Sequence, residues 1–205
     1  MCAQQRIALY GGTFDPVHVG HLEIARKVSQ LFEIEKILFI PAQVAPHKIG
    51  RLVTAPIHRY AMLALATQDD PQLLISSFEL DAPDRRYTVD TVAHFQRALG
   101  DSTELFFIMG ADSWAEITTW REWERLLTMI NFIVVTRPGY EPGTAHASNI
   151  FFTDAVMNDA SATNIRRLAR EGRYDELRNL LPRPVLEYIK KYEIYRELNE
   201  AKLNS

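Results

Sequence analysis

The sequence lacks the features that mark several common classes of protein. Only one of its 205 residues is a cysteine, Cys2, which excludes an intramolecular disulfide framework and fits a reducing compartment. No apolar run approaches the roughly 20 residues that a membrane-spanning helix needs. The first residues also lack a signal-peptide pattern. We therefore expect a soluble, cytoplasmic protein without a membrane partner.

Excess positive charge and two familiar phosphate-binding motifs are also missing. The formal net charge is −3, which argues against a general nucleic-acid binder, because such proteins usually carry a basic surface. Gly-x-x-x-x-Gly-Lys-Ser/Thr does not occur, and the first turn lacks Gly-x-Gly-x-x-Gly. Local basic residues at a site for an anionic substrate remain compatible with this composition.

Short apolar runs alternate with longer amphipathic stretches, which is typical of a parallel α/β sheet. The expected strands are Ile7–Tyr10, Lys36–Pro41, Leu73–Ser76, Leu105–Met109, Phe132–Thr136 and Ile150–Phe152. The expected helices are Leu22–Phe32, Pro56–Gln68, Val89–Leu99, a turn around Trp120–Leu127, Ala162–Glu171 and Pro184–Leu198. With 47% hydrophobic residues, the chain can bury the core of a single domain over residues 1–205, with a helical C-terminal part at about 161–205.

The most informative segment is Gly11–His21, which follows the first expected strand. The junction between a strand and the next helix is where an open parallel sheet binds its ligand. Gly11 and Gly12 let the backbone bend sharply and approach a charged group, and the free amides that open the helix suit phosphate. His18 and His21 are about one turn apart, so both rings can face one anion and carry positive charge near neutral pH. The segment predicts phosphoryl or nucleotidyl transfer.

The histidine pair has two other interpretations. A lone His-x-x-His pair more often caps a helix or packs in the core. A metal site is a weaker alternative, because two histidines without a nearby third ligand are an incomplete zinc site and Cys2 is remote in the sequence. We expect no metal held by the side chains of the protein.

Four further residues suit nucleotide binding, and each also has a purely structural explanation. Lys48 can close over a triphosphate from its loop, or remain a solvated lysine. Thr88 can contact a ligand or, with Asp90, cap the following helix. Asp112 follows the fourth strand, where it can accept hydrogen bonds from ribose hydroxyls or cap a helix. Trp120 can stack on a base, although the three tryptophans of this stretch more often belong to a core.

The last candidates follow the fifth strand and open a late helix. Arg137 follows the strand directly. Thr163 and Arg166 are one turn apart, so a hydroxyl, a guanidinium and free helix amides can converge on phosphate. An N-capped amphipathic helix is the structural alternative.

In this order, these segments resemble the bacterial nicotinate-mononucleotide adenylyltransferases of the H-x-G-H nucleotidyltransferase superfamily. The resemblance covers essentially the whole chain. The matching segments are Gly11–His21, Pro46–Lys48, Arg59, Tyr87–Thr91, Gly110–Asp112, Thr119-Trp120, Arg137–Gly139, Ser161–Arg166, Leu180–Pro182, Tyr188-Ile189 and Tyr195. The resemblance implies a Rossmann-like, doubly wound parallel sheet with a small C-terminal helical extension. It also implies an enzyme of NAD biosynthesis that joins the AMP part of ATP to nicotinic acid mononucleotide, giving deamido-NAD and pyrophosphate.

The resemblance further implies roles for individual residues. The catalytic residues would be His18, His21, Lys48 and Arg166. The ATP-binding residues would be Gly11, Gly12, Thr13, Phe14, His18, His21, Asp112, Arg137, Ser161, Thr163 and Arg166. The mononucleotide-binding residues would be Gly12, Thr13, Thr88 and Trp120, whose ring would stack on the pyridine. Magnesium would arrive with ATP, held mostly by phosphates and water.

The chain departs from the family pattern at Ala160–Thr163, at Arg85-Arg86 and in the stretch from Gly172 to Pro182, which is slightly longer than usual. Ala160-Ser161-Ala162-Thr163 replaces the more usual Ile-Ser-Ser-Thr, which leaves open how tightly the triphosphate is held. Arg85-Arg86 precedes Tyr87 where a serine is common, and two basic groups there can change mononucleotide selectivity.

Three alternatives stay open at this point. The acceptor can be nicotinamide mononucleotide, alone or together with the acid. The chain can be another superfamily member, such as a phosphopantetheine adenylyltransferase or a cytidylyltransferase, although both fit the motifs less well. It can also be a nucleotide-binding module without catalysis. The sequence determines neither the oligomeric state nor the regulation.

Overall fold

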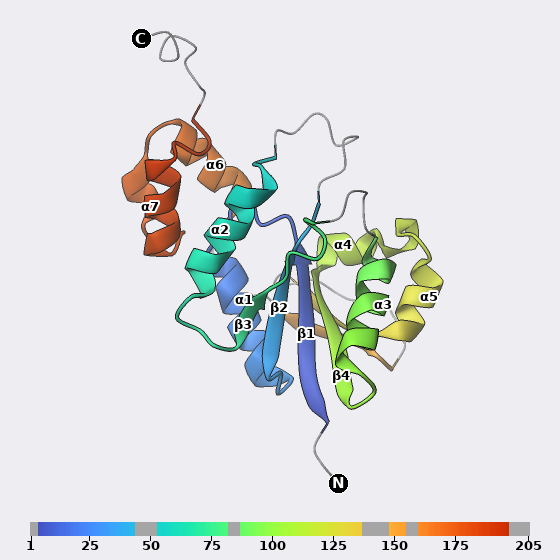
Figure 1. Ribbon diagram of the computed structural model, residues 1–205. Coiled ribbons are helices and arrows are strands. Elements are labelled where there is room, and N and C mark those ends of the chain that lie inside the picture. Colours follow the sequence, from blue (N-terminus) through green and yellow to red (C-terminus); the bar gives the residue numbers. More distant parts are fainter. Residues whose placement is uncertain (1–3, 44–52, 82–86, 137–147, 155–159, 197–205) are drawn as a thin grey trace.

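One parallel sheet lies at the centre of the fold. The computed structural model describes residues 4–43, 53–81, 87–136, 148–154 and 160–196. The strands are β1 (Gln5–Gly12), β2 (Lys36–Pro41), β3 (Leu73–Ile75), β4 (Thr103–Gly110), β5 (Asn131–Thr136) and β6 (Ile150–Asp154). Their order is β3-β2-β1-β4-β5-β6, and every neighbouring pair is parallel (Figure 1). This order confirms the predicted Rossmann-like sheet.

Helices connect the strands and follow them. The α-helices are α1 (Val19–Leu31), α2 (Pro56–Thr67), α3 (Thr88–Leu99), α4 (Ala111–Ala115), α5 (Trp123–Met129), α6 (Ala162–Arg170) and α7 (Arg183–Lys191). The described residues also form the short 3₁₀ helices η2 (Ile117–Thr119) and η3 (Tyr174–Leu177). Among the described residues, no helix is long and apolar enough to cross a membrane.

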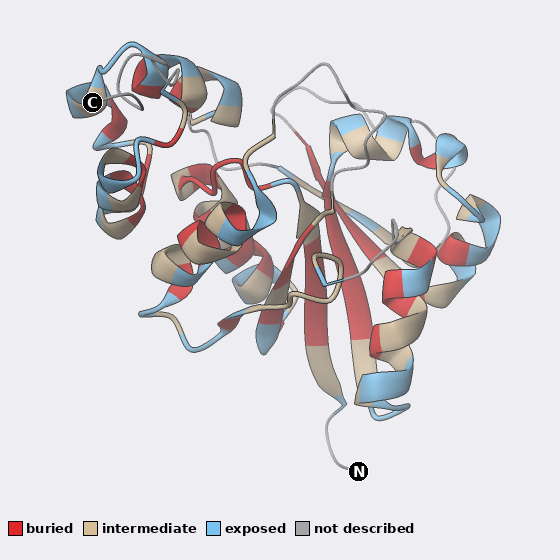
Figure 2. Ribbon diagram, turned by 45° about the horizontal axis from the view of Figure 1, so that its top comes forward, coloured by how far each residue is buried: buried red, intermediate tan, exposed pale blue. Residues whose placement is uncertain are grey.

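Alternate residues of β1 enter two hydrophobic clusters on opposite faces of the sheet. Ala8 and Tyr10 join the cluster that contains residues of α1, α2, α6 and α7. Ile7 and Leu9 join the cluster that contains residues of α3 and α5. Successive side chains of a strand point to opposite faces, so both faces of the sheet are covered, and the buried residues concentrate along the central strands (Figure 2). The sheet is therefore doubly wound, as predicted.

The chain reverses its direction of winding between β1 and β4. From β1 it proceeds through β2 to β3, and it then returns to place β4 on the other side of β1. In such sheets the crevice for a ligand opens beyond the carboxyl ends of the strands at this reversal. β1 ends at Gly12 and β4 at Gly110, so both predicted glycine-containing segments lie at this edge.

Three of the predicted helices differ from the structure by more than one residue at an end. α1 begins at Val19 instead of Leu22, which makes His18 its N-cap residue. The turn expected around Trp120–Leu127 is the short helix η2 followed by α5. α7 ends at Lys191 instead of continuing, because the chain then turns through positive φ angles and buries Ile194 in the core.

Candidate active site

His18 and His21 lie next to each other at the start of α1. Their ring centroids are 3.8 Å apart, which confirms that the two rings lie side by side. The backbone amide of His18 donates a hydrogen bond of 3.2 Å to Nδ1 of His21. Because Nδ1 is the acceptor, the neutral ring of His21 carries its proton on Nε2, which is then a donor. His18 is only 8% exposed, and its Nδ1 has no hydrogen-bond partner among the described residues.

Burial keeps both imidazoles neutral. It lowers the pKa of His18 to about 4, because the imidazolium form loses its hydration. It also lowers the pKa of His21 well below the usual range, and the adjacent His18 adds to this effect. The expectation of positive charge near neutral pH is therefore wrong for the protein without ligand. A bound polyphosphate would raise both pKa values again.

The depressed pKa of His18 predicts acid-sensitive stability. Between pH 6.5 and about 4 the unfolded chain binds more protons at this residue than the folded chain. Above pH 6.5 the His18 ring is neutral in both states, so the free energy of unfolding keeps its full value. It falls as the pH falls towards 4. We expect His18 to lower the free energy of unfolding by about 2 kcal/mol between pH 7 and pH 4.5, measured by urea denaturation. His18→Gln should lose this contribution, and an unchanged pH dependence in that variant would contradict the assignment.

Gly11 and Gly12 make room for aromatic rings instead of forming the sharp bend. A Cβ atom on Gly11 would lie 2.9 Å from Cζ of Phe107, and one on Gly12 would lie 2.8 Å from Cζ of Phe14. The positive φ angle of this junction, 49°, belongs to Phe14. The prediction that the glycines supply the bend is thus wrong, because both still belong to β1. The ring of Phe14 packs edge-on against His21 at 5.0 Å between centroids and so braces the histidine pair.

A buried arginine supports the loop between β1 and α1. Arg59, on α2, is 1% exposed. Its Nη1 donates to the carbonyl oxygen of Thr13 at 2.8 Å, and its Nε donates to the carbonyl oxygen of Thr54 at 3.0 Å. Burial lowers the pKa of Arg59, and the negative charge of Asp15 opposes this effect. The guanidinium thus ties the first loop residue to the segment that precedes α2.

Arg166 reaches the same loop from α6. Its Nη1 donates to the carbonyl oxygen of Asp15 at 2.6 Å, and its Nη2 donates to Oγ1 of Thr163 at 3.3 Å. The structure therefore confirms that Thr163 and Arg166 converge. It adds an anchoring contact to Asp15 that the sequence did not reveal. The contact of Arg166 with phosphate stays a prediction.

The other predicted ATP-binding residues occupy varied environments. Ser161 is the N-cap of α6, and its side chain accepts a hydrogen bond of 3.2 Å from the amide of Asn164. Thr13 and Asp112 are both exposed at the carboxyl edge of the sheet. Lys48 and Arg137 lie outside the described residues. The structural alternative therefore holds for Ser161, and the ligand contacts of the whole set remain predictions.

Thr88 and Trp120 are two of the four predicted mononucleotide contacts, and they lie at the start of α3 and just before α5. Thr88 is the first residue of α3, and Asp90 accepts a hydrogen bond of 3.3 Å from the amide of Tyr87, so the capping explanation applies to Asp90. Trp120 is half-buried against the cluster that contains residues of α3 and α5. Its ring lies edge-on to that of Phe107, at 6.3 Å between centroids. Packing therefore fixes the position of Trp120, and its predicted stacking would use the part of the ring that remains exposed.

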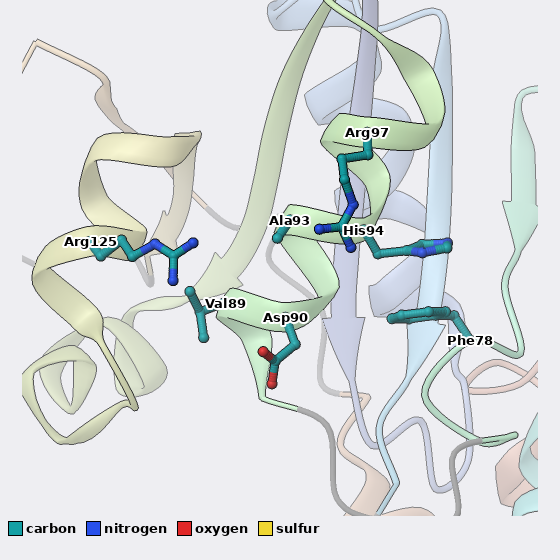
Figure 3. Close-up of a pocket in the computed structure, with 7 residues that line it drawn as sticks. All are labelled: Phe78, Val89, Asp90, Ala93, His94, Arg97 and Arg125. Atoms are coloured by element: carbon teal, nitrogen blue, oxygen red, sulfur yellow. The ribbon is translucent and has the colours of Figure 1, made fainter.

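A separate hollow of about 480 Å³ lies on α3 and α5 (Figure 3). It is lined by Phe78, Val89, Asp90, Ala93, His94, Arg97 and Arg125. The rings of Phe78 and His94 stack there at 3.9 Å between centroids. No lining residue belongs to Gly11–His21, so this hollow is distinct from the histidine site.

The sheet order and the segment that carries His18 and His21 have counterparts in known proteins. Residues 9–168 match the cytidylyltransferase-like family model, a range that includes both histidines and Arg166. A protein of Thermoanaerobacter sp. (strain X514) is named "probable nicotinate-nucleotide adenylyltransferase". It is 40% identical over 205 residues, which cover 95% of this chain and 96% of the relative. The chain belongs to this nucleotidyltransferase family.

Two more comparisons support the membership of this family. A relative of the same name from Thermus thermophilus is 40% identical over 194 residues, covering 93% of this chain and 100% of the relative. The structure of Plasmodium falciparum nicotinic acid mononucleotide adenylyltransferase complexed with NaAD aligns with a TM-score of 0.76. It covers 93% of this chain and 97% of that chain at 19% identity, and thus shares the fold. The predicted family resemblance is confirmed.

Proposed function

We propose that this chain transfers the adenylyl group of ATP to nicotinic acid mononucleotide, giving deamido-NAD and pyrophosphate. The observation that carries the proposal is the His18–His21 pair at the carboxyl edge of the sheet. It lies in a chain that shares 40% identity with named nicotinate-nucleotide adenylyltransferases over nearly its full length. The reaction makes this chain an enzyme of NAD biosynthesis.

The chemistry needs alignment and charge stabilisation instead of a protein nucleophile. A phosphate oxygen of the mononucleotide attacks the α-phosphorus of ATP in line. The bond from that phosphorus to the bridging oxygen of the β-phosphate breaks, and pyrophosphate leaves with the electron pair. The attacking oxygen is already anionic, so no general base is required. The protein has to bring two anions together and stabilise the charge that shifts onto the phosphate oxygens.

The histidine pair suits the stabilising role. The Nε2–H of His21 is a donor whose direction is set by the hydrogen bond at Nδ1. His18 has a buried ring nitrogen next to it. The proposal assigns the triphosphate to these rings with Lys48, Ser161, Thr163 and Arg166, and to the backbone of the loop after β1.

The mononucleotide is assigned to Thr88 and Trp120, at the start of α3 and before α5. The indole would stack on the pyridine, and Gly12 and Thr13 would separate the two nucleotides. Asp112 and Arg137 would contact ATP at the edge of the sheet. In this arrangement both substrates enter the crevice from the carboxyl side of β1 and β4.

Magnesium is proposed to enter with ATP. Within the described part of the chain, no group of three or more His, Cys, Asp or Glu side chains could hold a metal ion. The proposal gives the ion to the phosphates and water, where it would neutralise charge on the triphosphate. A cytoplasmic location stays a prediction.

A product assay tests the proposed function. Purified protein with magnesium and ATP is offered nicotinic acid mononucleotide, nicotinamide mononucleotide or phosphopantetheine, and the products are resolved by chromatography. We expect deamido-NAD to form at least about tenfold faster than NAD, because a site built for one polar group rejects its analogue. A parallel reaction with CTP should give no product.

Each other outcome selects one of the alternatives. Comparable rates with the acid and the amide would establish a dual-specificity enzyme. A product only with phosphopantetheine or only with CTP would establish another member of the superfamily. No product from any pair, with ATP still bound, would contradict the enzyme and favour a binding module.

A further inference from the structure

A tyrosine near the end of the described chain contacts the loop that carries the histidines. The hydroxyl of Tyr195 donates a hydrogen bond of 2.8 Å to Oδ1 of Asp15, across 180 positions of sequence. Asp15 lies three residues before His18 and is only 4% exposed. Burial raises the pKa of Tyr195, and the negative charge of Asp15 adds to the effect. The hydroxyl is therefore protonated near neutral pH and can donate to the carboxylate.

The backbone that presents Tyr195 is held in an uncommon conformation. After α7 ends, Glu193 has a φ angle of 50° and Tyr195 one of 75°. Ile194, between them, is 8% exposed and belongs to the core cluster. Residues with a side chain rarely adopt such angles unless their surroundings enforce them. Here the hydrogen bond from Tyr195 to Asp15 fixes the tyrosine, and the buried Ile194 adds packing beside it.

Asp15 is contacted by three distant segments. Its Oδ2 accepts a hydrogen bond of 3.1 Å from the amide of Thr54, and its carbonyl oxygen accepts one from Arg166. Tyr195 occupies the remaining carboxylate oxygen. With the carboxylate and the carbonyl both engaged, the backbone just before His18 has one stable position.

We propose that Tyr195 is a positioning residue for adenylyl transfer, which acts through Asp15 to hold the loop that presents His18 and His21 to the triphosphate. The inference rests on the proposed function. Without the hydroxyl, the loop would visit several arrangements, and only a fraction of bound substrate would be aligned for in-line attack. The turnover number should therefore fall, whereas substrate affinity should change little.

The test compares Tyr195→Phe with Ile194→Val. The first variant keeps the ring and removes one oxygen atom, and the second loosens the packing of the same segment without touching Asp15. At 25 °C we expect kcat of Tyr195→Phe to fall about tenfold while KM for both substrates stays within about twofold. We expect Ile194→Val to keep the wild-type kcat even though its melting temperature falls.

A double-mutant cycle tests whether Tyr195 acts through Asp15. Asp15→Asn retains an oxygen acceptor but loses the charge, and the double variant with Tyr195→Phe should lose no more activity than the worse single variant. If the fold-losses of kcat in the two single variants multiplied in the double variant, Tyr195 would not act through Asp15. An unchanged kcat in Tyr195→Phe, or an equal fall in Ile194→Val, would show a merely structural role. If the wild type forms no deamido-NAD, the proposed function fails and this inference fails with it, whereas an active wild type isolates the question of Tyr195.

Discussion

Replacing His21 with alanine is expected to lower kcat for deamido-NAD formation by about 10³-fold and to change the dissociation constant for ATP by less than about fivefold. The Nε2–H donor of His21 has its direction fixed by the bond from the amide of His18 to Nδ1. Charge on the phosphate oxygens shifts most in the transition state, so a fixed donor there is worth more than in the bound ground state. Product chromatography gives kcat, and titration calorimetry gives the affinity for ATP.

His94→Ala is the matched control for the loss of an imidazole. His94 stacks on Phe78 in the separate hollow on α3, away from the histidine pair. This variant should retain wild-type turnover. Equal losses of turnover and ATP affinity in His21→Ala would show that the ring binds ground state and transition state alike, which contradicts the proposed role. Unchanged turnover in His21→Ala would show that His21 takes no part in the chemistry.

The sheet could be predicted because its central strands are buried on both faces. Runs such as Leu105–Met109 are continuously apolar, and this pattern appears in β4 as five buried residues in sequence. The place of the histidine pair followed from the same pattern, since a ligand site of such a sheet lies where a strand meets its helix. The start of α1 was harder to predict, because the sequence allowed the histidines to cap a helix but did not single out His18 as the N-cap residue.

The properties that depend on tertiary burial could not be predicted. The charge state of His18 follows from its exposure of 8%, a quantity that local sequence does not contain. The contact between Tyr195 and Asp15 joins segments that meet only after the helices pack. One missed feature did have a signal in the sequence. Arg59 precedes Met62 and Leu63 at helical spacing, and this spacing alone places it on the buried stripe of α2.

Arg59→Met is expected to lower the free energy of unfolding by about 3–5 kcal/mol, measured by urea denaturation. The guanidinium is buried and donates to the carbonyl oxygens of Thr13 and Thr54. Methionine fills much of the same volume but leaves both oxygens without this donor and removes one positive charge near Asp15. A buried carbonyl oxygen without a donor lowers the free energy of unfolding by more than the loss of its hydrogen bond alone. Arg59→Lys keeps the charge without the planar fork, so it should be less destabilising than Arg59→Met.

Arg26→Met is the matched control, because it removes the same side chain from the surface. Arg26 is 54% exposed and pairs with Asp70 at 3.4 Å, a geometry worth no more than about 1 kcal/mol. If Arg59→Met cost no more than this control, the buried arginine would not be the support of the loop. A large loss is expected because methionine removes the buried guanidinium but none of the groups that face it. Asp15 and the two carbonyl oxygens stay where folding has placed them, and water cannot reach them as it reaches Asp70 beside Arg26.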